Sequence, residues 1–201
     1  MIQANLTRLN VDEFILRYGD CDSYELIDGE LIDLEPTGLH EQVISFIARK
    51  LNVEIDRLNL PYIIPHRCLV RISSDTAFRP DVIVLDQTQL ADEPLWPYQA
   101  VITSNLAIKL IAEVVSTNWQ NDYARKVEDY ALLGVPEYWI TDYLGLGGRD
   151  YIGTPKRSTL TICQLEGDRY QKRLFRQDDG LSSAIFPELR QAGAIFAAGQ
   201  V

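Results

Sequence analysis

The sequence predicts an α/β fold in which a mixed sheet is flanked by helices. Residues 40–60 carry apolar side chains at steps of three or four, which places one apolar stripe on a long amphipathic helix. Residues 81–86 and 107–115 are short apolar runs rich in β-branched side chains, which is typical of buried strands. The chain has 201 residues, a length that one core accommodates, so we expect a single domain over residues 1–201.

The N-terminal unit is expected to be a hairpin over residues 24–35, because Asp28 and Gly29 lie between two β-like runs. The long helix follows this hairpin. Residues 87–105 contain two prolines and are expected to form a loop. Strands are expected where apolar residues lie between proline-rich or polar breaks, at about 62–72, 81–86, 107–115 and 137–142.

A second helix is expected from about Asn121 to Leu133, because Gly134 and then Pro136 supply the usual signals for the end of a helix. Several glycines favour a loop around residues 145–155. The last elements are expected to be a hairpin and then a short strand with a helix, at 158–165 with 169–176 and at about 181–201.

The composition is that of an ordinary globular protein, with 46% hydrophobic and 24% charged residues. No apolar run approaches the roughly 20 residues of a membrane span, and the first residues lack a basic segment followed by a hydrophobic block. We therefore expect a cytoplasmic protein with no membrane contact. The three cysteines lack the spacing of a zinc site and there are only two histidines, so any metal is expected to be a hard, oxygen-ligated ion.

The net charge of −10 weighs against a nucleic-acid substrate, because nonspecific affinity comes largely from Lys and Arg side chains that neutralise phosphates. Binding needs only a local basic patch, however, and a metal site itself concentrates acidic groups. Scattered solubilising charge is an equally good interpretation of each basic residue. The residues that could form a patch near the candidate strands are Arg67, Arg71, Arg79, Arg125 and Lys126.

Two acidic residues stand at the start of one apolar strand and inside another. Asp81 follows Pro80, and Glu113 lies within a run of aliphatic residues. An ionised side chain in such a place is costly unless it is paired, solvated or bound to a metal, so a shared divalent cation is one explanation. The structural alternatives are a surface turn for Asp81 and a buried salt bridge for Glu113.

Four motifs follow one another in a recognisable order: Pro80-Asp81, Glu113-Val114-Val115-Ser116, the spacing of Asp122, Lys126 and Tyr130, and Gly134-Val135-Pro136-Glu137-Tyr138-Trp139. Together with Tyr24-Glu25-Leu26-Ile27-Asp28-Gly29-Glu30 and His40, this pattern resembles the Uma2 family of restriction-endonuclease-like proteins over roughly residues 14–190. The resemblance implies a nuclease fold of the PD-(D/E)XK type, a mixed sheet flanked by helices.

The resemblance also implies which residues act. Asp81 and Glu113 would ligate Mg²⁺ or Mn²⁺, with waters and a backbone carbonyl next to Glu113. The general nuclease pattern has a lysine two residues after the second acid, but this chain has Val115 there, so Lys126 on the following helix is the expected substitute. The structural alternative for Lys126 is a surface ion pair with Asp122, four residues earlier.

Glu30 and His40 are weaker candidates for the margin of the site, and they rest on the family pattern alone.

Lys126 would orient or help to deprotonate the attacking water, or stabilise charge on the phosphorus. The expected function is a Mg²⁺-dependent endonuclease that hydrolyses phosphodiester bonds in DNA. The alternative is a non-catalytic member of the fold that binds nucleic acid or a protein partner. A homodimer is the commonest oligomer and would suit a small nuclease that must meet two strands.

Overall fold

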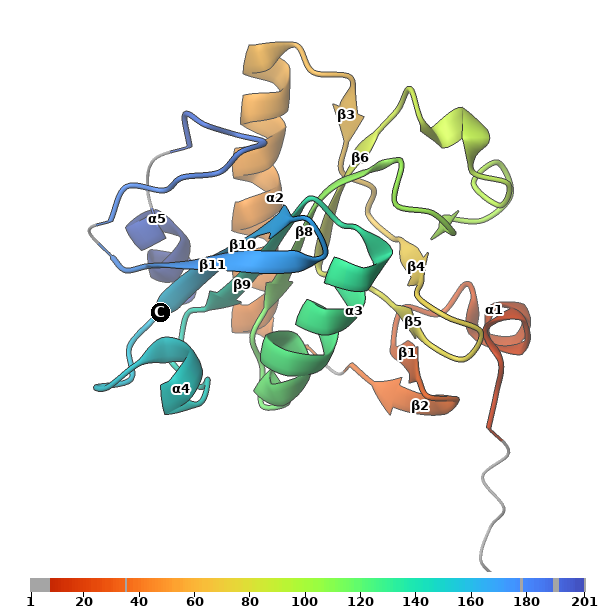
Figure 1. Cartoon of the computed structure of the whole chain (residues 1–201), viewed down its shortest axis with the longest axis horizontal. Coiled ribbons are helices and arrows are strands. Elements are labelled where there is room, and N and C mark those ends of the chain that lie inside the picture. Colours follow the sequence, from red (N-terminus) through yellow and green to blue (C-terminus); the bar gives the residue numbers. More distant parts are fainter. Residues whose placement is uncertain (1–7, 35, 178, 190–191, 201) are drawn as a thin grey trace, which may run out of the picture.

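The computed structural model describes residues 8–34, 36–177, 179–189 and 192–200. It has the predicted mixed α/β architecture, in which sheets are flanked by helices (Figure 1). The difference from the prediction is that the described strands form two mixed sheets and not one. The single strand expected at 62–72 is the reason, because its start pairs in one sheet and its end pairs in the other.

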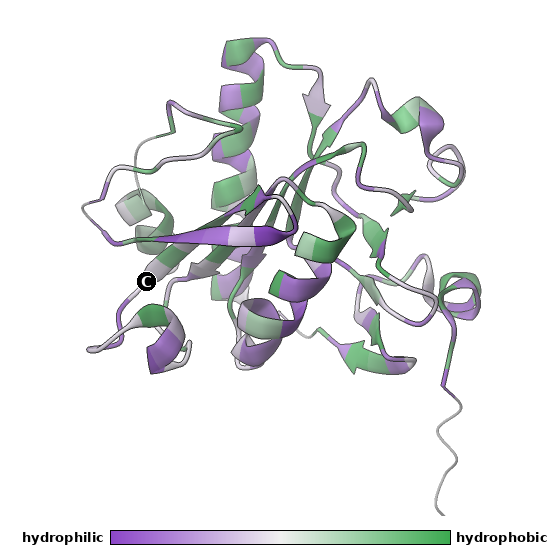
Figure 2. Ribbon diagram, viewed as in Figure 1, coloured by the Kyte–Doolittle hydropathy of each residue, from purple (hydrophilic) through white to green (hydrophobic). Residues whose placement is uncertain are grey.

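The larger sheet has six strands in the order β11-β10-β9-β8-β6-β3. β8 and β9 are parallel, and the other neighbouring pairs are antiparallel. The edge strand β11 is largely hydrophilic, whereas the strands behind it are largely hydrophobic (Figure 2). The bounds are β3 (Tyr62–Ile63), β6 (Val82–Asp86), β8 (Ile108–Val114), β9 (Glu137–Asp142), β10 (Thr159–Glu166) and β11 (Arg169–Phe175).

The smaller sheet has five strands in the order β2-β1-β5-β4-β7, and its first two strands are the predicted hairpin. The bounds are β1 (Tyr24–Ile27), β2 (Glu30–Asp33), β4 (Leu69–Arg71), β5 (Ala77–Phe78) and β7 (Val101–Ile102). The helix that packs on this sheet, α1 (Val11–Tyr18), was not among the predicted elements. Its signal is a capping box, in which Asn10 and Glu13 each bond to the backbone N–H of the other.

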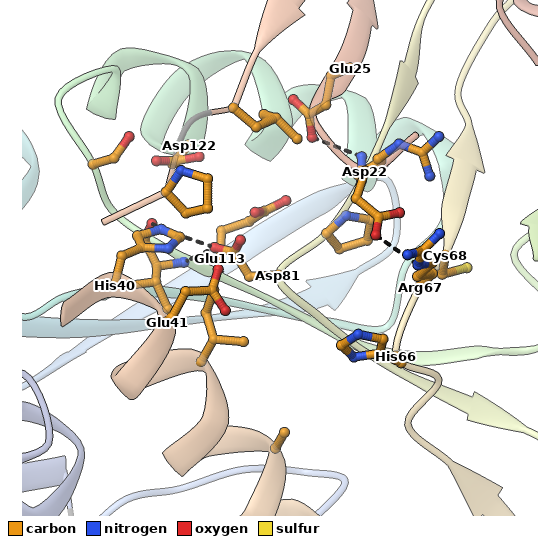
Figure 3. Close-up of a pocket in the computed structure, with 18 of the residues that line it drawn as sticks. Asp22, Glu25, His40, Glu41, His66, Arg67, Cys68, Asp81, Glu113 and Asp122 are labelled. Carbon is orange, nitrogen blue, oxygen red and sulfur yellow. Dashed lines mark hydrogen bonds and ion pairs between the residues drawn. The ribbon is translucent and has the colours of Figure 1, made fainter. Parts of the chain in front are cut away.

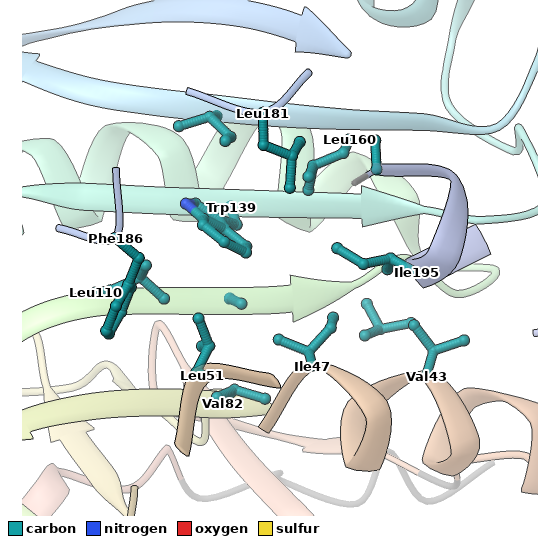
Figure 4. Packing of buried hydrophobic residues seen from close by; sticks show 14 of the residues in the cluster. Val43, Ile47, Leu51, Val82, Leu110, Trp139, Leu160, Leu181, Phe186 and Ile195 are labelled. Carbon is teal, nitrogen blue, oxygen red and sulfur yellow. The ribbon is translucent and has the colours of Figure 1, made fainter. Parts of the chain in front are cut away.

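The predicted long helix is α2 (Gly38–Leu58), and it covers one face of the larger sheet (Figure 1). Val43, Ile47 and Leu51 of this helix point toward the strands, where they pack in one buried cluster with Val82 (Figure 4). The apolar stripe of the sequence is therefore the face of the helix that builds this core.

The opposite face of the larger sheet is covered by the second predicted helix (Figure 1). Its first turn is a π-helix (Asn121–Arg125), and it continues as α3 (Lys126–Leu133). The helix ends at Gly134 with φ of 89°, the left-handed conformation in which glycine commonly ends a helix. Tyr130 on α3 is fully buried, as expected of a residue between helix and strand.

The remaining segments carry short elements that the sequence analysis did not predict. The loop at 87–105 contains a 3₁₀ turn (Leu90–Asp92) and β7, and the loop at 145–155 contains α4 (Arg149–Ile152). The tail has the expected helix, α5 (Ala192–Ala197), but its described residues include no strand. None of the helices in the described ranges is both long and apolar enough to cross a membrane.

Candidate active site

The candidate site lies where the chain passes from the smaller sheet to the larger one. Asp81 stands at this crossing, between β5 and β6. A cavity of about 760 Å³ opens here, lined by residues of β1, α2, β8 and the π-helix. Figure 3 shows His40, Asp81 and Glu113 on one side of the cavity and His66 and Arg67 on the other.

Asp81 is held by the backbone of the neighbouring strand. Its Oδ2 accepts a hydrogen bond from the N–H of Val114 at 2.7 Å, and the His40 Nε2 lies 3.5 Å from the same oxygen. Burial raises the pKa of Asp81 well above its ordinary value, and the nearby carboxylate of Glu113 raises it further. A positive group shared by the two carboxylates would relieve this repulsion.

Glu113 is buried in β8, on the face that meets α3. Its Oε1 accepts hydrogen bonds from the Lys126 Nζ and from the Tyr130 hydroxyl, both at 3.0 Å. The buried salt bridge considered for Glu113 is therefore present. Lys126 is only 5% exposed, so it is not the surface partner of Asp122, whose Oδ1 lies 3.8 Å from the Nζ.

Glu25 and Asp122 are two further carboxylates of the cavity that the sequence analysis left without a role. The Glu25 Oε1 accepts hydrogen bonds from the Lys126 Nζ at 3.2 Å and from the Arg79 N–H at 2.8 Å. Asp122 lies in the π-helix, a rare local geometry that is frequent at functional sites. Asp122 was considered before only as the possible partner of Lys126 at a spacing of four residues. The contact of Glu25 with Lys126, 101 residues away, depends on long-range packing and has no local signal.

The surroundings of Lys126 keep its amine charged. Burial alone lowers the pKa of this lysine, but the carboxylates of Glu113, Glu25 and Asp122 outweigh that effect and raise it well above its ordinary value. A charged ammonium has no free electron pair, so this environment favours roles in which Lys126 acts as a positive charge. Of the roles expected for this residue, orientation of the water and stabilisation of negative charge suit such an ammonium best.

The two weaker candidates have different positions. His40 lines the cavity, and its Nε2 lies 2.7 Å from the backbone oxygen of Val114. Glu30 lies on β2, does not line the cavity, and faces Arg8 at 3.8 Å in an exposed ion pair. The structure therefore brings His40 to Asp81 and leaves Glu30 outside.

The basic residues considered as a phosphate-binding patch are all engaged within the chain. Arg67 pairs with Asp22, Arg71 with Asp12, and Arg125 with Asp28 and Asp129, while Arg79 donates to the backbone oxygens of Tyr18, Gly19 and Tyr24. Among the described residues, the Lys and Arg side chains that line the cavity are Arg67, Arg79 and Lys126. Seven Asp or Glu side chains of the described residues line it: Asp22, Glu25, Asp33, Glu41, Asp81, Glu113 and Asp122. Acidic side chains therefore outnumber Lys and Arg in the described lining of the cavity.

Comparison with known proteins shows the family to which this chain belongs. The model of the Uma2 family, described as a putative restriction endonuclease, matches residues 11–195. The chain belongs to the Uma2 family. No curated protein matches the sequence.

A solved structure has the same fold as this Uma2 chain. It is described as the crystal structure of a putative nuclease belonging to DUF820 from Anabaena variabilis ATCC 29413. The two structures agree with a TM-score of 0.70 over 95% of this chain and 99% of the other. The sequence identity is 16%, so this likeness establishes the nuclease-like fold and not a reaction.

In this Uma2 chain the lysine of the cavity comes from a helix and not from the strand that carries Glu113. Val115, two residues after Glu113, is buried among apolar residues and offers no amine. Lys126 reaches Glu113 from α3, so the lysine expected from the following helix is present in the cavity.

Proposed function

We propose that this Uma2 chain is a Mg²⁺-dependent endonuclease that hydrolyses phosphodiester bonds in DNA. The observation that supports the proposal is the convergence of Asp81, Glu113 and Lys126 in one cavity. Asp81 directly precedes β6, Glu113 lies on β8 and Lys126 begins α3, and each is of the type that metal-dependent phosphodiester hydrolysis needs. The family and the nuclease-like fold agree with this reaction.

The donor set suits a magnesium ion that relies on water and substrate. Within the described ranges, no group of three or more His, Cys, Asp or Glu side chains is arranged to hold a metal ion. Mg²⁺ keeps several waters and is commonly bound by one or two carboxylates together with substrate phosphates, so Asp81 and Glu113 fit it. Mn²⁺ takes the same oxygen ligands. When bound there, the cation would polarise the phosphate and acidify a bound water.

Individual oxygen atoms support the same assignment. The Oε1 of Glu113 is occupied by Lys126 and Tyr130, whereas its Oε2 has no hydrogen-bond partner among the described residues. In Asp81 the Oδ2 bonds to the backbone of Val114, and the Oδ1 likewise has no partner in that part of the chain. Each candidate ligand thus has one oxygen fixed by the protein and one oxygen left for a ligand.

Lys126 would act as a fixed positive charge. Its ammonium lies against Glu113, and it would stabilise negative charge that develops on the phosphorus or orient the attacking water. Because acidic side chains outnumber Lys and Arg in the described lining of the cavity, productive binding of DNA is expected to require the cation. This requirement reconciles a net charge of −10 with a nucleic-acid substrate.

The test is cleavage of DNA with Mg²⁺ or Mn²⁺, combined with calorimetric titration of both ions. We expect the wild type to bind the ion, and the Asp81→Asn, Glu113→Gln double variant to lose binding. Each single variant should lose cleavage by more than the roughly 10- to 100-fold typical of residues that only support ligands.

Glu30→Gln is the matched control, because it neutralises an exposed carboxylate outside the cavity and should leave both properties unchanged. Unchanged cleavage in correctly folded Asp81→Asn contradicts the proposal. Absence of ion binding in the wild type, with and without DNA, favours the alternative of a non-catalytic binding protein. That alternative draws support from Val115 and from the internal pairing of the arginines.

We also propose that the active protein is a homodimer, since a twofold dimer is the commonest oligomer and would present one site to each strand of a duplex. Light scattering over a range of concentrations tests this proposal. A monomer at every concentration contradicts it.

A further inference from the structure

Glu25 contacts more of the proposed site than its place in an N-terminal hairpin suggests. It lies on β1 of the smaller sheet, is 2% exposed, and lines the cavity between the two sheets. A carboxylate buried this completely needs charged or strongly polar partners. Both of its partners belong to the proposed site or to the segment beside it.

The first partner is the ammonium of Lys126. The Nζ lies 3.2 Å from the Oε1 of Glu25 and 3.0 Å from the Oε1 of Glu113, so the two carboxylates share it. Asp122 is more distant, at 3.8 Å. A lysine has a flexible four-carbon stem, and two short contacts from different sheets hold its charge at one point.

The second partner is the backbone just before Asp81. The N–H of Arg79, two residues before Asp81, donates to the same Oε1 of Glu25 at 2.8 Å. One oxygen of Glu25 therefore joins Lys126 to the segment that carries Asp81. Glu113 completes the arrangement from the other side of the ammonium.

We propose that Glu25 is a positioning residue of the cleavage site, which holds the Lys126 ammonium against Glu113 and fixes it relative to Asp81. The inference rests on the proposed nuclease function. In this arrangement Glu25 does not touch the substrate. It acts through Lys126, and it keeps the positive charge in place when Glu113 is engaged by a cation.

The chain contains a matched control for this role. The same hairpin is tied to the same helical segment by a second ion pair, in which Arg125 contacts Asp28 at 2.8 Å. This pair is next to Lys126 in sequence but is on the exposed outside. Asp28→Asn therefore weakens the docking of the hairpin and leaves the ammonium untouched, whereas Glu25→Gln removes a charge from the ammonium and preserves the shape of the side chain.

The experiment compares wild type, Glu25→Gln and Asp28→Asn by NMR of ¹⁵N-labelled lysine ammonium groups and by steady-state cleavage. A buried, paired ammonium exchanges slowly with water, so we expect a resolved Lys126 signal in the wild type and in Asp28→Asn. Glu25→Gln should lose or broaden that signal. It should also lower kcat by about 10- to 100-fold with little change in KM, the loss expected of a supporting residue.

Retention of the ammonium signal and of kcat in folded Glu25→Gln overturns the inference. An equal loss in Asp28→Asn also overturns it, because the effect would then come from docking of the hairpin. If Glu25→Gln does not fold, the contact between Glu25 and Lys126 is tested in the wild type instead. Transfer of magnetisation across the hydrogen bond, from the Lys126 Nζ to the carboxyl carbon of Glu25, supports the contact, and its absence with transfer to Glu113 alone contradicts it.

Failure of the proposed function has a different signature. A wild type that binds no cation and cleaves no DNA contradicts the nuclease proposal. The Lys126 signal and its transfer to Glu25 then report on the contact between the two residues independently of activity.

Discussion

Asp122 shows how a single buried residue links this site to stability. Burial raises the pKa of Asp122 to about 8, with Lys126 opposing and Glu113 and Glu25 adding to the rise. The unfolded value is near 3.8, so between about pH 4 and pH 8 the folded chain holds a proton that the unfolded chain has lost. The free energy of unfolding therefore falls as the pH rises through this window.

Asp122→Asn removes this titration and should become more stable relative to wild type as the pH rises. One pKa unit corresponds to about 1.4 kcal/mol, so we expect the difference in free energy of unfolding to change by at least about 1 kcal/mol between pH 5 and pH 8. Urea unfolding at the two pH values, with a chelator present, measures it. Glu25 and Asp81 also have raised pKa values, but they are common to both proteins.

Asp28→Asn is the control for the pH experiment. The hydrogen bond from Arg125 lowers the pKa of Asp28, so this residue is ionised in the folded and unfolded chains from pH 5 to pH 8. The effect of Asp28→Asn on the free energy of unfolding should therefore not depend on pH between pH 5 and pH 8. If the free energy of unfolding depends on pH in the same way in Asp122→Asn and in the wild type, the raised pKa assigned to Asp122 is contradicted.

At the scale of elements, the helical segment that begins with the π turn fixes where Lys126 lies. The C-terminal end of this segment is set by Gly134, whose N–H bonds to the backbone oxygens of Tyr130 and Ala131. Gly134 has a positive φ, and a Cβ added to it would lie 2.5 Å from the Nδ2 of Asn105. This glycine therefore meets both a conformational and a steric requirement.

Gly134→Ala should lower the free energy of unfolding by at least about 1 kcal/mol, because alanine is strained at this φ and Asn105 must move. The midpoint of urea unfolding measures the change. Gly38→Ala is the matched control, since no atom lies within 4 Å of a Cβ added at this position in the first turn of α2. An equal effect of the two substitutions contradicts the argument.

At the scale of the whole molecule, the two sheets share a core. Val70 and Phe78 of the smaller sheet lie in the same buried cluster as Ile83 and Ile111 of the larger sheet. The chain also passes directly from β5 to β6 at Asp81. Neither sheet can lose its packing without exposing apolar surface of the other.

We therefore predict that residues 1–201 unfold as one domain, in a single cooperative transition. Urea unfolding by far-UV circular dichroism should coincide with the loss of hydrogen-exchange protection in peptides from β1–β2 and from β9–β10. Earlier loss of protection in β1–β2, with the larger sheet intact, contradicts the prediction. It would mean that the hairpin that carries Glu25 unfolds separately from the larger sheet.

Much of the fold follows from local pattern. The stripe of α2 predicted both the helix and its buried face, Asp28-Gly29 predicted the first hairpin, and Gly134 predicted the end of α3. The split of residues 62–72 between two sheets has no such signal, because strand pairing joins residues that are distant in sequence. The helix α1 was not predicted, although its capping box, Asn10 with Glu13, is visible in the sequence.

The types of residue in the site were equally readable. The cost of an acid at or inside an apolar strand marked Asp81 and Glu113, and the family resemblance assigned their roles. Spacing, by contrast, suggested a surface pair for Lys126 and Asp122, whereas Lys126 is buried. Its strongest contacts are with Glu113, 13 residues away, and with Glu25, 101 residues away. Periodicity and spacing are properties of a short stretch of chain, so they specify helices, turns and candidate residues. The partners of a buried charge depend on which strands and helices pack together, and that packing makes the burial of Lys126 tolerable.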